Sequence, residues 1–452
     1  MLPGRRRQIN WNFLQRKGKP LFERPDWLSR YLYKTVQAWY REINRAQWRT
    51  LIAAQLGWML DAMDVMLYSF ALAAIRAEFH LTAAAAGALG AAPLVTSALG
   101  GMLFGWLSDR YGRSRALVWS IVTFSAFTAF TATARTIPEL IFWRAIVGIG
   151  LGGEWAAGAV LVAETWPERH RGKAIGLMQS AWAIGYLLAA LLAGIMLPRF
   201  SWRPLFLAGI LPALITLWIR RNIPEPPKWQ QPSHNLWGAL AALFRPPLLR
   251  NVALFTALCS SVLFGYWGMF TWLPAYLSMP VAQGGAGLSV LRSSAWIVPL
   301  QIGAFFGYMS FGFYADRVGR RAAFLTFVLT TAVLVPVYGL FGRNAALLLA
   351  LGPLVGFFGH GYFSALGAMA AELFPAAVRT TAQGFGYNAG RALSGLAPVT
   401  VGALADRHGI GTALAFTSIF FVLGGGLMML VPAERRLHQV CADSSKGLAG
   451  SD

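Results

Sequence analysis

Two related stretches decide the fold of this chain: GWLSDRYGRSR, Gly105 to Arg115, and GFYADRVGRR, Gly312 to Arg321. Each follows a long apolar run, and each has a glycine shortly after its acid, which permits a tight turn. A second pair of stretches, ETWPERHR from Glu164 and ELFPAAVR from Glu372, lies in the two halves at nearly the same spacing, about 207 residues. A third echo, GALADRHG, begins at Gly402. Two motif pairs at one spacing indicate an internal duplication.

The composition excludes an ordinary soluble protein. Of the 452 residues, 56% are hydrophobic and 13% are charged, whereas about a quarter of the residues in soluble domains are charged. The apolar runs are long enough for helices to cross a roughly 30 Å hydrocarbon core. We predict an all-α polytopic membrane protein whose twelve transmembrane spans lie near 50–76, 84–107, 116–134, 138–164, 173–197, 202–220, 250–277, 290–314, 322–342, 345–373, 381–404 and 410–431.

Polar segments divide the chain and predict its orientation. A basic extension, residues 1–49, precedes one six-helix bundle, 50–221; a proline-rich linker, 222–249, leads to the second, 250–431, and to a tail, 432–452. With the N-terminus inside, the inner segments hold about four times as many Lys and Arg as the outer ones, as the positive-inside rule requires. This distribution predicts a multi-pass protein of the cell (inner) membrane with both termini in the cytoplasm.

Several function classes lack their signatures. The formal net charge of +21 is spread between apolar runs and not gathered on one soluble module, so it predicts no nucleic-acid partner. Cys259 lies in a span and Cys441 in the tail, which offers neither a disulfide framework nor a metal cluster. No phosphate-binding loop, HExxH motif or catalytic constellation is present. We predict no metal, no cofactor and no enzyme activity.

The first span contains LDAMDVMLYSF, Leu60 to Phe70, with two acids three residues apart on one helical face. A charge at the bilayer centre costs roughly 2.5–3.5 kcal/mol on insertion scales, so such acids indicate a functional site, unless they only satisfy a nearby cation or end a helix. A carboxyl group away from water favours its neutral form and can exchange a proton near neutral pH. Asp61, Asp64 and Glu154 of the fourth span are therefore predicted proton-coupling residues, although Glu154 is equally well explained as a structural partner of Arg144 or of a backbone group.

These motifs resemble those of a known family. The Gly-small-Asp-Arg-Gly-Arg pattern of both halves resembles the signature of the major facilitator superfamily, and Arg144 with Gly148 and Gly150 resembles its fourth-helix motif. Within it, LDAMD, GIGLGGEW, ETWPERHRGKAIG and RRNIPEPPKW are most similar to the sialate:proton symporter family, which includes monocarboxylate permeases. The acid pair also resembles that of aromatic-acid:proton symporters, although Ala62 and Met63 stand where Gly and Phe are more usual. The resemblance implies the major facilitator fold, twelve transmembrane helices in two pseudo-symmetric six-helix bundles.

The resemblance also implies roles for the charged loop residues. They would form cytoplasmic clusters that latch helices in the outward-open state and release them on closing inward; the alternative is that they only cap helices and set topology. The residues of these gating clusters are Asp109, Arg113, Glu164, Arg171, Asp316, Arg320, Glu372 and Arg379. By the same resemblance, Arg144 takes part in proton coupling.

Arg391 lies near the middle of the eleventh span, and the spans of the second half contain no acid to pair with it. Its planar guanidinium suits a carboxylate held by two hydrogen bonds. Either Asp61 or Asp64 reaches it across a central cavity, or a substrate brings the carboxylate, or the arginine has a structural role elsewhere. The side chains predicted to complete a substrate site are Tyr68, Gln179, Trp182, Tyr266, Trp267, Gln301, Tyr387 and Asn388.

Together these features predict a secondary active transporter: a symporter that imports a small organic anion by alternating access, driven by the proton gradient. The carboxylate could be a sialic acid, a monocarboxylate or an aromatic acid. The expected partners are the anion, protons and the lipid bilayer, and the expected state is a monomer. Two alternatives stay open, a proton-driven exporter or antiporter of the same fold and a nutrient sensor that transports nothing.

Overall fold

The computed structural model describes residues 40–167, 170–211, 213–214, 218, 243–246, 248–342, 344–375 and 378–431. The chain divides into two compact units, Met1–Arg45 and Ala46–Asp452, and nearly all of the described residues belong to the second. Most of the predicted basic extension and linker, and the whole predicted tail, lie outside the described residues. Within the described ranges the chain is helical or in short connections, and no strand occurs there.

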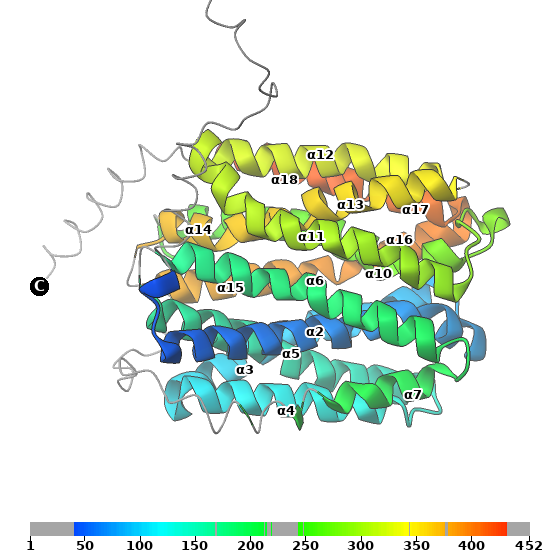
Figure 1. Ribbon diagram of the computed structural model, residues 1–452, viewed down its shortest axis with the longest axis horizontal. Helices are drawn as coiled ribbons and strands as arrows, with labels where there is room; N and C mark the ends of the chain where they lie inside the picture. The colour runs from blue at the N-terminus through cyan, green and yellow to red at the C-terminus, as the bar shows by residue number, and fades with distance from the viewer. Residues whose placement is uncertain are drawn as a thin grey trace, which may run out of the picture. The chain divides into compact units, whose positions relative to one another are not determined.

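The first half of the chain forms long helices joined by short turns (Figure 1). They are α2 (Arg45–Glu78), α3 (Ala83–Tyr111), α4 (Arg113–Thr131), α5 (Ile137–Thr165), α6 (Arg171–Met196) and α7 (Trp202–Leu207), which the 3-10 helix η3 (Ala208–Ile210) continues. Hydroxyl groups cap the first turns of three of these helices: Thr82 accepts a hydrogen bond from the Ala85 N–H, Thr136 accepts one from the Glu139 N–H, and Ser201 accepts one from the Arg203 N–H.

The second half begins with α10 (Leu248–Ser278), the 3-10 helix η4 (Val281–Gln283), α11 (Val290–Val318) and α12 (Arg320–Leu340). Its last three predicted spans are each two helices in series: α13 (Ala345–Gly361) with α14 (Phe363–Leu373), α15 (Arg379–Ser394) with α16 (Leu396–His408), and α17 (Ile410–Phe416) with α18 (Ser418–Leu430). The break between α15 and α16 has a chemical cause. Pro398 lacks the N–H that would bond the Ser394 carbonyl, and its ring crowds that turn.

The repeated motif builds the same turn in both halves. Gly112 between α3 and α4 has φ 108°, and Gly319 between α11 and α12 has φ 87°. Each donates its N–H to a carbonyl four residues earlier, in Ser108 and Ala315. A residue with a Cβ is strained at such positive φ, which explains why glycine stands at this place in both copies.

The two bundles, α2 to η3 and α10 to α18, pack closely within themselves and against each other. In the first, α5 lies against α3 and α4, and in the second, α11 lies against α13. Between the bundles, α6 runs beside α11, as Figure 1 shows, and α3 packs against α15 and α16. Glycine makes the closest approaches possible: a Cβ at Gly152 of α5 would collide with the Ser97 backbone, and one at Gly356 of α13 with that of Leu300.

The predicted fold class is confirmed. Each of the twelve predicted spans coincides with helix in the described chain, although the sixth is described only in part. Among the described residues, eight helical segments are long and apolar enough to cross a membrane by length and composition: those beginning at Arg45, Ala83, Gly172, Leu248, Val290, Arg320, Ala345 and Ile410.

Candidate transport site between the bundles

The three predicted proton-coupling acids are all buried. Asp61, Asp64 and Glu154 have no solvent exposure, and their carboxyl oxygens have no hydrogen-bond partner within the described chain. Glu154 of α5 fits against α2 because Gly57 has no side chain: a Cβ there would collide with its Oε1 atom. Buried carboxyls without partners are costly when ionised, which suits groups that change their protonation.

The two acids of α2 have different neighbours. Asp61 interacts electrostatically with Arg391 of the second bundle, and Glu154 interacts with both Asp61 and Arg391. Asp64, by contrast, faces Thr128 of α4 and Arg144 of α5, inside the first bundle. Three residues along a helix turn the side chain by 300°, so the two acids point about 60° apart. The shared face that the spacing predicts is therefore split between two environments.

Arg144 is enclosed within the first bundle. It is 1% exposed, and its Cζ atom lies 4.4 Å from the centre of the Tyr68 ring. The Tyr68 hydroxyl donates a 2.6 Å hydrogen bond to the carbonyl of Ala86 in α3, which fixes the ring beneath the guanidinium. Tyr68, predicted to contact substrate, thus supports Arg144 and does not line the central cavity.

Arg391 lines a cavity between the two bundles. It is 2% exposed, its Nε and Nη2 atoms have no hydrogen-bond partner, and no ion pair joins it to an acid of the described chain. Its Cζ atom lies 5.7 Å from the centre of the Trp267 ring. The other residues that line the cavity are Trp58, Gln179, Trp182, Leu263, Tyr266, Trp267, Tyr308, Phe363 and Tyr387.

This central cavity is small in the present conformation. Its volume is about 20 Å³, room for about one water molecule. Helices α2 and α6 of the first bundle and α10, α11, α14 and α15 of the second contribute its walls. An organic acid can enter only when these walls move apart, and the walls belong to different bundles.

Hydrogen bonds join the bundles beside the cavity. The Trp182 indole N–H donates to the Tyr266 hydroxyl over 2.6 Å, and that hydroxyl lies 3.2 Å from Nε2 of His360. Because the carbonyl of Gly356 can only accept, Nδ1 of His360, 3.0 Å away, donates to it. His360 thus has a partner at each ring nitrogen. The Tyr186 hydroxyl adds a second link from α6 to α10, to the carbonyl of Phe270.

The structure brings together most, but not all, of the predicted substrate residues. Gln179, Trp182, Tyr266, Trp267, Tyr387 and Arg391 line the same cavity. Gln301 is buried elsewhere on α11 with both amide atoms unpartnered, and Asn388 donates to the carbonyl of Gly384 in its own helix. The sequence analysis did not predict four residues that line the cavity: Trp58, Leu263, Tyr308 and Phe363. Among them only Trp58 could have been found from the sequence, because it lies one helical turn before Asp61.

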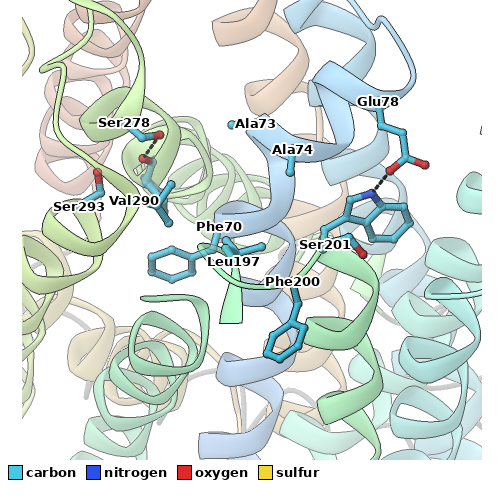
Figure 2. Close-up of a pocket in the computed structure, with 12 residues that line it drawn as sticks. Phe70, Ala73, Ala74, Glu78, Leu197, Phe200, Ser201, Ser278, Val290 and Ser293 are labelled. Atoms are coloured by element: carbon cyan, nitrogen blue, oxygen red, sulfur yellow. Dashed lines mark hydrogen bonds between the residues drawn. The ribbon is translucent and has the colours of Figure 1, made fainter. Parts of the chain in front are cut away.

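A second cavity lies at the C-terminal end of α2, the end that the sequence predicts to face outward. Its volume is about 250 Å³, and Figure 2 shows Phe70 and Ala74 of α2 on one side and Ser278 and Ser293 of the second bundle on the other. Glu78 at its rim accepts a 2.6 Å hydrogen bond from the Trp202 indole and pairs with Arg203. None of the three buried acids and neither buried arginine lines it, so it is distinct from the central cavity.

The charged loop residues lie at both ends of the bundles. At the predicted inner end, Arg320 and Glu372 form an ion pair within the second bundle, and Asp316 is exposed. The side chains of Asp109, Arg113, Glu164, Arg171 and Arg379 lie outside the described set.

The third echo of the motif closes the opposite end. Asp406 at the end of α16 lies 3.3 Å from the Arg76 guanidinium and accepts hydrogen bonds from the N–H groups of Ala83 and Ala84. These N–H groups begin α3, and a helix N-terminus favours an anion. Asp406 therefore ties the second bundle to the first at the predicted outer end.

The fold and this site define a class of protein, a helical membrane protein whose two related bundles enclose a charged central site. Comparison with known proteins names the family: the sequence profile of the Major Facilitator Superfamily matches residues 56–308 and 287–447. The chain belongs to this superfamily. Its members are transporters, so the prediction of a transporter and not an enzyme is confirmed.

Two of the relatives are named as transporters of organic acids. The chain is 32% identical to the cis,cis-muconate transport protein of Acinetobacter baylyi, over 87% of its own length and 96% of the relative's. It is 30% identical to the sialic acid transporter NanX of Escherichia coli, over 85% of its own length and 94% of the relative's. The crystal structure of a D-xylose-proton symporter superposes with a TM-score of 0.68 at 20% identity, over 87% of this chain and 99% of that one, which shows the shared fold.

Proposed function

We propose that this transporter imports a small organic carboxylate together with protons, by alternating access. One observation carries the proposal: Arg391 is buried beside the central cavity with two guanidinium nitrogens unpartnered and no acid of the described chain in ion-pair contact. A buried cation that cannot lose its charge needs an anion, and a substrate carboxylate meets that need. The cation in the cavity also counts against an exporter of cations.

The lining of the cavity supports a flat, largely apolar acid over a sugar acid. Apart from Arg391 and the amide of Gln179, the walls are aromatic rings and Leu263. Aromatic walls stack against flat unsaturated or aromatic bodies. Each hydroxyl of a polyhydroxylated acid would instead lose hydrogen bonds to water, at a cost of about 1–3 kcal/mol when it finds no partner. Among the sequence alternatives, this favours an aromatic or unsaturated carboxylate.

The charges of the core support coupling to protons. The buried charged groups of the described bundles are the carboxyls of Asp61, Asp64 and Glu154 and the guanidiniums of Arg144 and Arg391. They are balanced when one carboxyl is protonated, and an added monoanion requires a second proton. Because uncompensated charge is costly in the membrane interior, each carboxylate would enter with one proton, and uptake of a monoanion would be electroneutral.

A transport cycle follows from this balance. With the cavity open outward, protonation of Asp61 or Glu154 would release Arg391 from their field and leave it to the incoming carboxylate. The neutralised centre would then permit closure at the Asp406 end, and release of the proton to the cytoplasm would reset the site. The contacts of Asp406 with α3 and the charge clusters at the inner end would hold the two closed states, as a bistable gate requires.

The experiment is uptake of radiolabelled benzoate, nicotinate, cis,cis-muconate and sialic acid into proteoliposomes, with and without an inward proton gradient and at a clamped membrane potential. We expect gradient-driven accumulation of a flat acid, its loss in Arg391→Ala, and loss of uphill uptake in Asp64→Asn.

Three results would contradict the proposal. Accumulation in Asp64→Asn with an unchanged pH dependence would remove the role of that acid in proton coupling. Proton-driven loss of a cation from the vesicles would favour an antiporter. Binding of an acid without any flux would favour a nutrient sensor.

A further inference from the structure

Three tryptophans surround the central cavity, and their indole N–H groups differ in one respect. Trp182 packs between the other two, with ring centres 4.8 Å from Trp58 and 5.9 Å from Trp267. Its N–H is committed to the Tyr266 hydroxyl. The N–H groups of Trp58 and Trp267 are buried, on side chains only 4% exposed, and have no hydrogen-bond partner.

Two unpartnered donors in one wall are unusual, because buried polar groups nearly always find a hydrogen-bond partner. An indole N–H donates and never accepts, so only an acceptor can satisfy it. The guanidinium of Arg391 brings two further unpartnered nitrogens to the same cavity, and these too only donate. The fully buried unsatisfied groups among the described residues that line this cavity are thus all donors, which is the complement of an anion.

We propose that Trp58 and Trp267 donate their indole N–H groups to the substrate carboxylate that Arg391 holds, and that they set the preference for a carboxylate over a neutral ligand. The inference rests on the proposed function and adds the two residues that select the charged group. Trp58 belongs to α2 and Trp267 to α10, so one carboxylate would be bound from both bundles at once. Its binding would draw the bundles together around the cavity.

For Trp58, a carboxyl of the protein is an alternative acceptor. Trp58 lies one turn from Asp61, and a small rearrangement would bring its N–H to that acid instead of to a ligand. If the Trp58 N–H bonds to Asp61, its removal would change the pH dependence of binding equally for charged and neutral ligands. The ratio of the two affinities therefore distinguishes a donor to substrate from a donor to Asp61.

The experiment measures dissociation constants of the purified full-length protein for nicotinate and benzoate, and for their neutral counterparts nicotinamide and benzamide. The variants are Trp58→Phe, Trp267→Phe and the double change, which keep an aromatic ring and remove the N–H. The control is Trp202→Phe, which also keeps an aromatic ring and whose N–H serves Glu78 outside the central cavity. Melting temperatures check that each variant folds.

We expect each single change to weaken carboxylate binding about 10-fold or more, as loss of a hydrogen bond to a charged group does, and to leave amide binding within about twofold. The double variant should lose more of the preference for the carboxylate than either single variant and keep the part that Arg391 supplies, and the control should keep the whole preference. An unchanged carboxylate-to-amide ratio in both single variants, while the native protein binds the acids, would overturn this inference alone. If the native protein bound no acid at all, the proposed function would fail with it.

Because Trp58 and Trp267 stand in different bundles, failure of one variant to fold leaves the other as the test. Equal weakening of acid and amide in both would assign the indoles to packing, and would equally overturn the proposal.

Discussion

The two buried arginines, Arg144 and Arg391, have the same chemistry and nearly the same burial but contrasting surroundings. Arg144 lies over the ring of Tyr68, with Asp64 in its field, and all three belong to one bundle. Arg391 interacts electrostatically with Asp61 and Glu154 of the other bundle and lines the cavity between the two bundles. One arginine is enclosed within one bundle, and the other stands where the two bundles meet.

The contrast shows that the role of a charged side chain in a membrane core depends on the helices that surround it. In the proposed cycle, partners within one bundle would stay together, so Arg144 would keep its neighbours. Partners in different bundles would separate when the cavity opens, so Arg391 would exchange its neighbours during the cycle. A group of that kind can couple a ligand to a conformational change.

The largest expected effect is a difference between the two arginine variants: one should lose stability and the other should lose acid binding. Arg144→Ala removes a desolvated cation from over Tyr68 and leaves Asp64 without its nearby cation, so we expect a loss of stability of about 2 kcal/mol or more. Arg391→Ala should fold with a melting temperature close to the native one but lose acid binding. Thermal unfolding and equilibrium binding of both variants in the same detergent test the pair. If Arg391→Ala is the less stable variant and still binds acids, the contrast drawn between the two arginines is wrong.

The next effect concerns the acid that faces Arg391. Asp61→Asn removes a competing negative charge while keeping nearly the same shape, so substrate binding should persist or tighten severalfold. Uptake should cease to respond to a proton gradient, whereas exchange of external for internal substrate should continue. Counterflow and gradient-driven uptake, measured on the same vesicles, separate these steps. Loss of exchange together with uptake would show that Asp61 holds the substrate site in shape and does not couple it to protons.

The smallest effect tests the position of Glu154. A Cβ at Gly57 would collide with Oε1 of Glu154, which must then move away from α2, whereas a Cβ at Gly158 would lie an ordinary 3.8 Å from the same atom. Gly57→Ala should therefore shift the pH dependence of uptake, with a change of about twofold to fivefold in rate at neutral pH. Gly158→Ala is the matched control and should leave it unchanged. Identical pH profiles in the two variants would place Glu154 outside the coupling machinery.

Much of this architecture was predictable from local sequence. Span positions follow from runs of apolar residues, and the two turns at Gly112 and Gly319 follow from a repeated glycine that sits at positive φ in both halves. The importance of Asp61, Asp64, Glu154 and Arg391 follows from the cost of charge in a membrane, which needs no knowledge of neighbours. Tyr68 shows the limit, because its position on the acid-bearing helix did not reveal that its ring packs under Arg144.

The sequence by itself determined that the chain is a duplicated helical membrane protein with three acids and two arginines in its core, because hydrophobicity, charge and repeats are properties of short segments. Only the tertiary structure decided that Asp61 interacts with Arg391 of the other bundle while Asp64 interacts with Arg144. It also decided that the Trp182 N–H donates to Tyr266, whereas the N–H groups of Trp58 and Trp267 have no hydrogen-bond partner within the described chain. Each of these depends on which distant helix packs against which face. Two acids whose directions differ by about 60° on one helix can have neighbours in different bundles, and no local sequence pattern predicts those neighbours.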